Sequence, residues 1–189
     1  KFFIRSIEGN QIALGKEHPN TMLCIRNLIE CYDESGNYEN VIKQYKILRV
    51  LYENKLGPEA LDTLICINNL GLAYYDDGDY KKAEPLFVKA LDGFKKTLDP
   101  NDGNIRATTN NLALVYTELG NTDKAIEYYN ILIDLQKEHL GPKAVDTLLS
   151  INNLGLAYYN DGDYKKAEPF YVKALDGFKK TLDPNDGNI

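Results

Sequence analysis

The chain has 189 residues and a formal net charge of −6, with 43% hydrophobic and 26% charged residues. This composition is ordinary for a globular protein with a core, so it argues against disorder. The acidic balance disfavours nucleic acid as a partner, because phosphates repel it, and gives no attraction to anionic membrane surfaces.

Localisation can be argued from three features. No apolar run approaches the roughly 20 residues needed to span a bilayer. The first ten residues lack the apolar segment of a signal peptide. The three cysteines are an odd number without CxxC spacing, which indicates reduced thiols. We therefore expect a cytoplasmic protein without membrane contact.

Repeats with a 42-residue period follow one another along the chain. Residues 1–17 match the end of a repeat, and 186–189 match the start of one. The four repeats between them span 18–59, 60–101, 102–143 and 144–185. Residues that fall 42 apart define the period: Asn27, Asn69, Asn111 and Asn153; Tyr32, Tyr74, Tyr116 and Tyr158; Gly36, Gly78, Gly120 and Gly162. In addition, 61–105 and 145–189 are near-identical copies at an offset of 84.

Each repeat is predicted to form two helices. In the second repeat, the first helix covers about 60–76 and buries a stripe containing Ile67, Leu70, Gly71 and Tyr74. Gly78 ends it, and Asp79 is a good N-cap for the second helix, about 80–97. The corresponding caps are Asn37, Asn121 and Asp163. One such hairpin cannot bury both apolar faces alone, so neighbouring repeats must stack.

These residues resemble the tetratricopeptide repeat, through the spacing Leu70-Gly71-x2-Tyr74-x3-Gly78-x-Tyr80-x2-Ala83. The period of 42 is similar to the kinesin light chain group, as are the Asn-Asn-Leu, Lys-Ala-Glu-Pro and Leu-Gly-Pro segments. A period near 40 also occurs in HEAT and armadillo repeats, which the spacing disfavours. The resemblance implies an all-α fold, a right-handed superhelical solenoid of antiparallel helix pairs that forms one domain over 1–189.

The resemblance also implies a concave groove lined by the first helices. In kinesin light chains the second Asn of Asn-Asn-Leu binds the backbone of extended peptides, which implies that role for Asn69, Asn111 and Asn153. Asn27 occupies the equivalent position of the first repeat and is included with them. A carboxamide suits that role because it both donates and accepts. The remaining predicted groove residues are Asn68, Asn110, Asn152, Leu72, Leu114, Leu156, Tyr75 and Tyr159. The alternative reading is structural: the amides bond within the helices, and the tyrosines pack on their neighbours.

We call Asn27, Asn69, Asn111 and Asn153 the ladder asparagines. The chain departs from the family one helical turn before each of them. Grooves that take acidic peptides carry basic residues there, whereas this chain has Leu23, Ile65, Ala107 and Leu149. The expected partner is therefore a protein or peptide that is apolar or mildly basic rather than acidic.

No motif in the sequence favours catalysis, a cofactor or a metal. Asp99 to Gly103 hints at a calcium loop, but the glycine falls one position early for an EF-hand, so a turn is favoured. We expect a non-catalytic scaffold. The alternatives are a structural array that self-associates through exposed repeat ends, and the regulatory arm of a larger multidomain protein.

Overall fold

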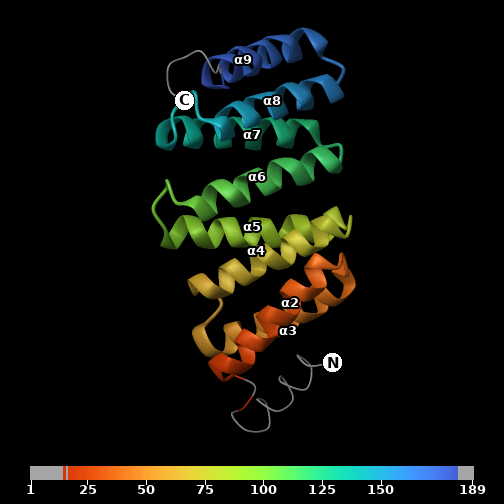
Figure 1. Ribbon diagram of the computed structural model, residues 1–189, viewed down its shortest axis with the longest axis vertical. Coiled ribbons are helices and arrows are strands. Elements are labelled where there is room, and N and C mark those ends of the chain that lie inside the picture. Colours follow the sequence, from red (N-terminus) through yellow and green to blue (C-terminus); the bar gives the residue numbers. More distant parts are fainter. Residues whose placement is uncertain (1–14, 16, 183–189) are drawn as a thin grey trace. The chain divides into compact units, whose positions relative to one another are not determined.

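The computed structural model describes residue 15 and residues 17–182, and Figure 1 shows its helices coloured along the sequence. In this part the chain forms eight helices and no strand. It divides into two compact units, unit 1 up to Leu98 and unit 2 from Asp99 onward. The predicted start of a further repeat at 186–189 and most of the predicted tail 1–17 lie outside the described residues.

Each unit consists of two helix pairs. Unit 1 contains α2 (Pro19–Glu34), α3 (Tyr38–Leu56), α4 (Leu61–Asp76) and α5 (Tyr80–Thr97), and unit 2 contains α6 (Gly103–Glu118), α7 (Thr122–His139), α8 (Val145–Asn160) and α9 (Tyr164–Leu182). Within a unit each helix packs against the next along the chain. None of these eight helices combines the length and the hydropathy needed to cross a membrane.

A short turn with a glycine joins the two helices of a pair. Gly78 has a φ of 81°, in the left-handed region that a residue without a Cβ adopts without strain. Asp79 follows and accepts a hydrogen bond from the Lys82 backbone N–H at 3.3 Å, which satisfies a free donor of α5. Equivalent bonds, each from the backbone N–H three residues on, confirm the predicted caps Asn37, Asn121 and Asp163.

The first helix of a pair begins in another way. Both α4 and α8 have alanine at the N-cap and no side-chain cap. Instead, the buried Thr63 hydroxyl donates to the Gly57 backbone oxygen at 2.8 Å, a bond that we call the threonine–glycine clamp. It recurs between Thr147 and Gly141 and between Thr21 and Gly15. At the start of α6 Asp102 is the cap, and it accepts from the Asn104 N–H at 2.7 Å.

The predicted apolar stripes form the core. Ile67 and Leu70 of α4 and Phe87 of α5 are all at most 1% exposed. A Cβ on Gly71 would lie 2.9 Å from Phe87 Cε1, closer than real Cβ atoms approach, so only glycine lets the ring pack this tightly on α4. Burying a ring of this kind contributes roughly 1.5–3 kcal/mol. Close packing therefore holds the helices that position the pockets described below.

Candidate peptide-binding pockets

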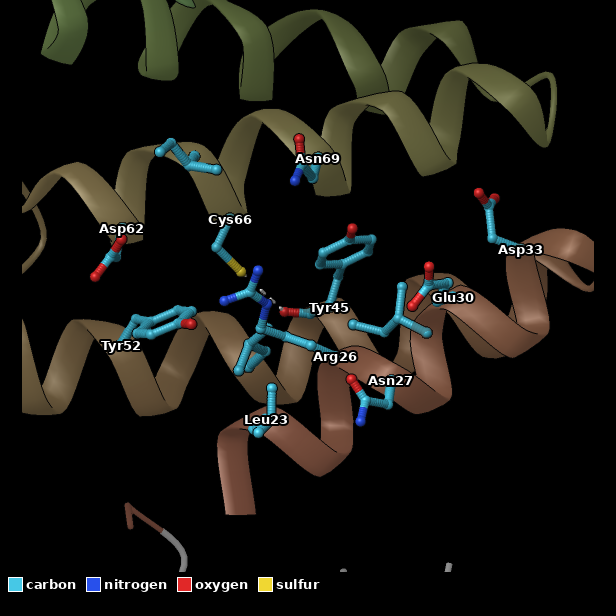
Figure 2. Close-up of a pocket in the computed structure, with 13 residues that line it drawn as sticks. Leu23, Arg26, Asn27, Glu30, Asp33, Tyr45, Tyr52, Asp62, Cys66 and Asn69 are labelled. Atoms are coloured by element: carbon cyan, nitrogen blue, oxygen red, sulfur yellow. Dashed lines mark hydrogen bonds between the residues drawn. The ribbon is translucent and has the colours of Figure 1, made fainter. Parts of the chain in front are cut away.

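Unit 1 contains a pocket of about 470 Å³ between the first helix of one pair and the first helix of the next, shown in Figure 2. Helices α2 and α4 form the walls and α3 the floor. The lining residues are Leu23, Arg26, Asn27, Ile29, Glu30 and Asp33 of α2, Tyr45, Leu48 and Tyr52 of α3, and Asp62, Ile65, Cys66 and Asn69 of α4. The pocket thus brings together Asn27 and Asn69, two of the predicted ladder residues.

The Asn69 amide already has partners inside unit 1. The Asn68 Nδ2 donates to Asn69 Oδ1 at 3.2 Å. Burial raises the pKa of Tyr45, and a hydrogen bond from the Asn69 side chain to the tyrosine opposes that shift. Part of the hydrogen-bonding capacity of Asn69 is therefore used by its neighbours, as the structural reading of the sequence anticipates.

Cys66 lies in the α4 wall and is a buried thiol. Its Sγ donates to the Tyr45 backbone oxygen at 3.8 Å, and the Arg26 guanidinium lies near it in Figure 2. Burial raises the pKa of Cys66 from 9.0 to about 12, although the charge of Arg49 opposes the shift. Because the thiolate is the reactive form, Cys66 is unsuited to act as a nucleophile.

Acidic residues outnumber basic ones around this pocket. Glu30, Asp33 and Asp62 line it, and Arg26 is its single cation. Beyond the pocket, burial raises the pKa of Asp76 on α4, and the nearby carboxylate of Asp33 raises it further. A ligand with positive charge would therefore be attracted here and an acidic one repelled.

Unit 2 contains a pocket of about 450 Å³ in the equivalent place. Helices α6 and α8 form its walls, and residues at the end of α7 form its floor. The lining residues are Gly103, Arg106, Ala107 and Asn110, then Gln136 and Leu140, then Asp146, Leu149, Ser150 and Asn153. This pocket brings together two further predicted groove residues, Asn110 and Asn153.

The polar groups of the unit 2 pocket differ from those of unit 1. At an offset of 84, Asn110 replaces Arg26 and Ser150 replaces Cys66. Gln136 takes the place of Tyr52. No bond equivalent to that between Asn68 and Asn69 joins their copies in the described part of unit 2. The pocket therefore has carboxamides and a hydroxyl where unit 1 has a guanidinium, a phenol and a thiol.

Gln136 stands out because it is buried and incompletely bonded. The residue is 8% exposed, and its Oε1 has no hydrogen-bond partner among the described residues. Arg106, on the neighbouring wall, donates through Nη1 to the Asn101 backbone oxygen. An unpaired buried acceptor costs roughly 1–3 kcal/mol relative to a bonded one, so this amide is a polar group that the core of unit 2 leaves unsatisfied.

The other predicted groove residues do not line either pocket. Leu72 and Leu156 are exposed on α4 and α8, whereas Asn68, Asn111, Leu114 and Asn152 are half-buried. The Tyr75 ring lies 5.3 Å from that of Tyr80, and the Tyr159 ring lies 5.1 Å from that of Tyr164. The peptide-binding role of the whole predicted set stays a prediction.

Sequence reasoning missed the contribution of the second helices. Tyr45, Tyr52 and Gln136 reach the pockets from α3 and α7, although the repeat pattern assigns that face of the second helix to the core. The usable signal was the contrast at equivalent positions: Phe94 occupies the place of Tyr52 and Gln136 in the second repeat. Polar residues at a position that is otherwise aromatic and buried mark a pocket floor.

The described part of the chain contains no group of three or more His, Cys, Asp or Glu side chains that could hold a metal ion. The arrangement offers amides, hydroxyls and carboxylates at the pocket walls, which are groups that recognise a ligand by hydrogen bonds and charge.

Comparison with known sequences identifies one family. The profile of the tetratricopeptide repeat matches residues 42–96 and 104–180. A search of curated proteins gives no match.

Comparison with solved structures gives several similar folds. The nearly identical TPR-like repeats of a candidate kinesin light chain from Podosopora anserina share 21% identity with this chain at a TM-score of 0.83, covering 95% of this chain and 85% of that one. BtubC (BKLC) from P. vanneervenii shares 19% identity at a TM-score of 0.82, covering 99% of this chain and 74% of that one. MamA shares 22% identity at a TM-score of 0.68, covering 95% of this chain and 89% of that one.

These likenesses concern the fold. The fold class expected from the sequence, an all-α array of antiparallel helix pairs, is confirmed, and so is the resemblance to kinesin light chain repeats. At such identities the similar structures say nothing about ligands.

Proposed function

Because the chain belongs to the tetratricopeptide repeat family, we propose that it is a non-catalytic scaffold that binds a peptide or a partner helix along its first helices. Proteins of this fold generally mediate protein–protein interaction, and the family is generally non-catalytic. The observation that carries the proposal is the recurrence of one pocket, walled by successive first helices, in both units.

The amides at the pocket walls suit the backbone of an extended peptide. Asn27 and Asn153 each offer a donor and an acceptor, so they pair with peptide groups whatever the ligand sequence. Leu23 and Ile65 stand beside them as apolar contacts in unit 1. Backbone pairing supplies general affinity, and the lining side chains supply selection.

The charge of the unit 1 pocket favours a basic or apolar ligand over an acidic one. Glu30, Asp33 and Asp62 face a single cation, Arg26. The net charge of −6 also disfavours nucleic acid and anionic membranes as partners. We place the protein in the cytoplasm, where its thiols would stay reduced.

Two alanine variants test the groove. Peptides would be selected on the full chain from a displayed random library, and their affinity measured by fluorescence polarisation. Asn27→Ala and Asn153→Ala should each weaken a selected peptide by about fivefold, because each removes one hydrogen bond to the ligand. Asn69 is a poorer test position, since its loss also breaks bonds inside unit 1.

The matched control is Asn54→Ala, which removes the same amide from an exposed position of α3 away from the pocket. It should leave affinity unchanged. If both pocket variants keep full affinity, or lose thermal stability instead, the amides are structural and the groove proposal is wrong.

A second candidate function is self-association, and one observation favours it. On α9, Val172 and Leu175 are 51% and 53% exposed, whereas Ile133, at the position of Leu175 on α7, is 4% exposed. A second copy would cover this face. Light scattering over a concentration series tests the idea: a growing mass that Leu175→Glu abolishes supports it, and a constant monomer mass rules it out.

A further inference from the structure

Each unit has a second concave site, beside its last helix. In unit 2 a cleft of about 680 Å³ lies between α9 and the start of α8, and we call it the α9 cleft. In unit 1 a cleft of about 670 Å³ lies in the equivalent place on α5, and we call it the α5 cleft. None of the predicted groove residues lines either cleft, so these sites are separate from the proposed peptide groove.

The α9 cleft has an apolar interior. Pro169 and Val172 of α9 line it together with Pro142 and Leu148, and Val172 is 51% exposed. A Cβ on Gly177 would collide with the Leu148 side chain, so the glycine is what lets α8 and α9 pack this closely. The interior can therefore accept an apolar side chain of a ligand.

The lysines of the α5 cleft are paired with carboxylates. Lys89 Nζ lies 3.4 Å from Glu53 Oε1, and Lys96 Nζ lies 3.6 Å from Glu59 Oε2. Lysines and carboxylates line this cleft in equal number, so their charges balance.

Unit 2 has lost both of these carboxylates. At an offset of 84, Lys137 and Lys143 occupy the positions of the two glutamates, and Lys173 and Lys180 occupy those of the two lysines. Neither Lys173 nor Lys180 has an ion pair within the described residues. Three lysines and two carboxylates line the α9 cleft, so it is net positive in a chain whose net charge is −6.

Two of these lysines are brought together at one end of the α9 cleft. The Thr181 hydroxyl donates to the Lys143 backbone oxygen at 3.3 Å, which ties the loop before α8 to the turn of α9 that carries Lys180. Lys173 lies two helical turns before Lys180 and lines the same cleft. Like charges on one site repel each other, and an anion between them turns that repulsion into attraction.

We propose that the α9 cleft binds an acidic peptide segment, with a carboxylate between Lys143 and Lys180 and a neighbouring apolar side chain against Val172. Charge complementarity argues for the carboxylate. The apolar interior argues for a peptide rather than a nucleic acid, because a phosphate backbone offers no apolar group to fill it. The protein then has two binding surfaces with opposite charge preferences.

Titration with acidic peptides tests the proposal. A displayed library of random peptides, each with two glutamates, is selected on the full chain, and isothermal titration of the best binder gives affinity and stoichiometry. The wild type should bind one peptide per chain. Lys143→Glu copies the arrangement of unit 1 and gives Lys180 a partner, so it should weaken binding by about tenfold.

The reciprocal variant tests the same charge difference as a gain of binding. Glu59→Lys frees Lys96 and gives the α5 cleft the lysine of unit 2, so a second, weaker site for the peptide should appear. The matched control is Lys165→Glu, at an exposed position of α9 that lines neither cleft. It changes the net charge as Lys143→Glu does, and should alter affinity by less than about twofold.

Three results would overturn the inference: no acidic peptide binds the full chain, Lys143→Glu keeps the affinity, or Lys165→Glu lowers it equally. It also fails if Asn27→Ala and Asn153→Ala weaken the acidic peptide, because the peptide would then lie in the groove. An oligonucleotide of equal charge that binds as tightly and is lost with Lys143→Glu would show a general polyanion surface instead. The groove has its own peptides and variants, so the two proposals fail separately.

Discussion

The two pockets occupy the same place in their helix pairs and yet differ in chemistry. The α4 and α8 walls are near-copies, with Asp62 matching Asp146 and Asn69 matching Asn153. On these walls Ser150 takes the place of Cys66, and the rest of the contrast comes from the other wall and from the floor, where α2 and α3 differ from α6 and α7. One constant wall combined with one variable wall gives the array different pockets without a change of fold.

The same contrast affects the bonding of the ladder asparagines, through a tyrosine of the second helix in each unit. In unit 1 the Tyr45 hydroxyl bonds to Asn69. In unit 2 its counterpart Tyr129 bonds to Thr117 of α6, at the position where unit 1 has Asp33, and burial raises the pKa of Tyr129. The bonding of a repeated residue therefore depends on variable neighbours, and four variant sets can break or sharpen this comparison.

Thiol reactivity should show the largest effect. A variant that keeps only Cys66 should react with iodoacetamide about a thousandfold more slowly than one that keeps only the exposed Cys31, because a pKa of about 12 leaves little thiolate near neutral pH. The labelling rate of Cys66 should rise about tenfold for each pH unit up to that pKa. Mass spectrometry follows the labelling.

Urea serves as the control for that measurement, since unfolding should make the two thiols equally reactive. Rapid labelling of folded Cys66 would show that the α4 wall opens readily, and the pocket described here would not be its resting form.

The charge difference between the pockets should have the next largest effect. Removing two charges with Glu30→Gln and Asp33→Asn should weaken a selected basic peptide by about tenfold and flatten its salt dependence, because attraction at the unit 1 pocket is lost. Isothermal titration at low and high salt measures both effects. Asp146→Asn in unit 2 is the matched control and should change the affinity less; equal effects would remove the charge distinction between the pockets.

Stability should distinguish the two copies of the ladder asparagine. Asn69→Ala breaks bonds with Asn68 and Tyr45, and should lower the free energy of unfolding by about 1 kcal/mol. Asn153→Ala should cost at most about 0.3 kcal/mol, since it loses no such bonds. Urea unfolding curves give both values, and equal losses would contradict the difference in bonding.

The smallest effect should come from making unit 1 more like unit 2 at Asp76, whose copy is Asn160. The pKa of Asp76 is raised in the folded protein by burial and by Asp33, so its contribution to stability is present at low pH and is lost as the pH rises through that pKa. Asp76→Asn should therefore stabilise the protein by about 0.3 kcal/mol at neutral pH, a small gain because solvent screens this exposed residue.

Acid conditions are the internal control, because the gain from Asp76→Asn should disappear where Asp76 is protonated. Thermal melts over a pH series follow it. A gain that is constant with pH would point to helix propensity rather than to charge.

The sequence predicts the helices well because their signals are local. The second helix of the second repeat, predicted over about 80–97, is Tyr80–Thr97, and the cap at Asp79 and the buried Phe87 are confirmed. Turn glycines, caps and apolar spacing act within a few residues of the chain, so one repeat is enough to read them.

The pockets are harder to predict because they depend on contacts between helices of different repeats. The ladder pattern places Asn69 and Asn153 alike, yet their bonding is set by Tyr45 and Tyr129 from other helices. Gln136 carries no local signal of an unpaired oxygen, since its environment is made by three helices. A periodic pattern shows which residues share a face and does not show which of them are already satisfied.

The threonine–glycine clamp bears on how such a chain could be lengthened or shortened. An insertion after Gly57 or Gly141 would pull the threonine hydroxyl away from its carbonyl. The junction before α6 has Asp99 in place of the glycine and Ile105 in place of the threonine, so an insertion between Leu98 and Asp99 breaks no such bond. That junction is the natural splice point for building arrays from 84-residue cassettes.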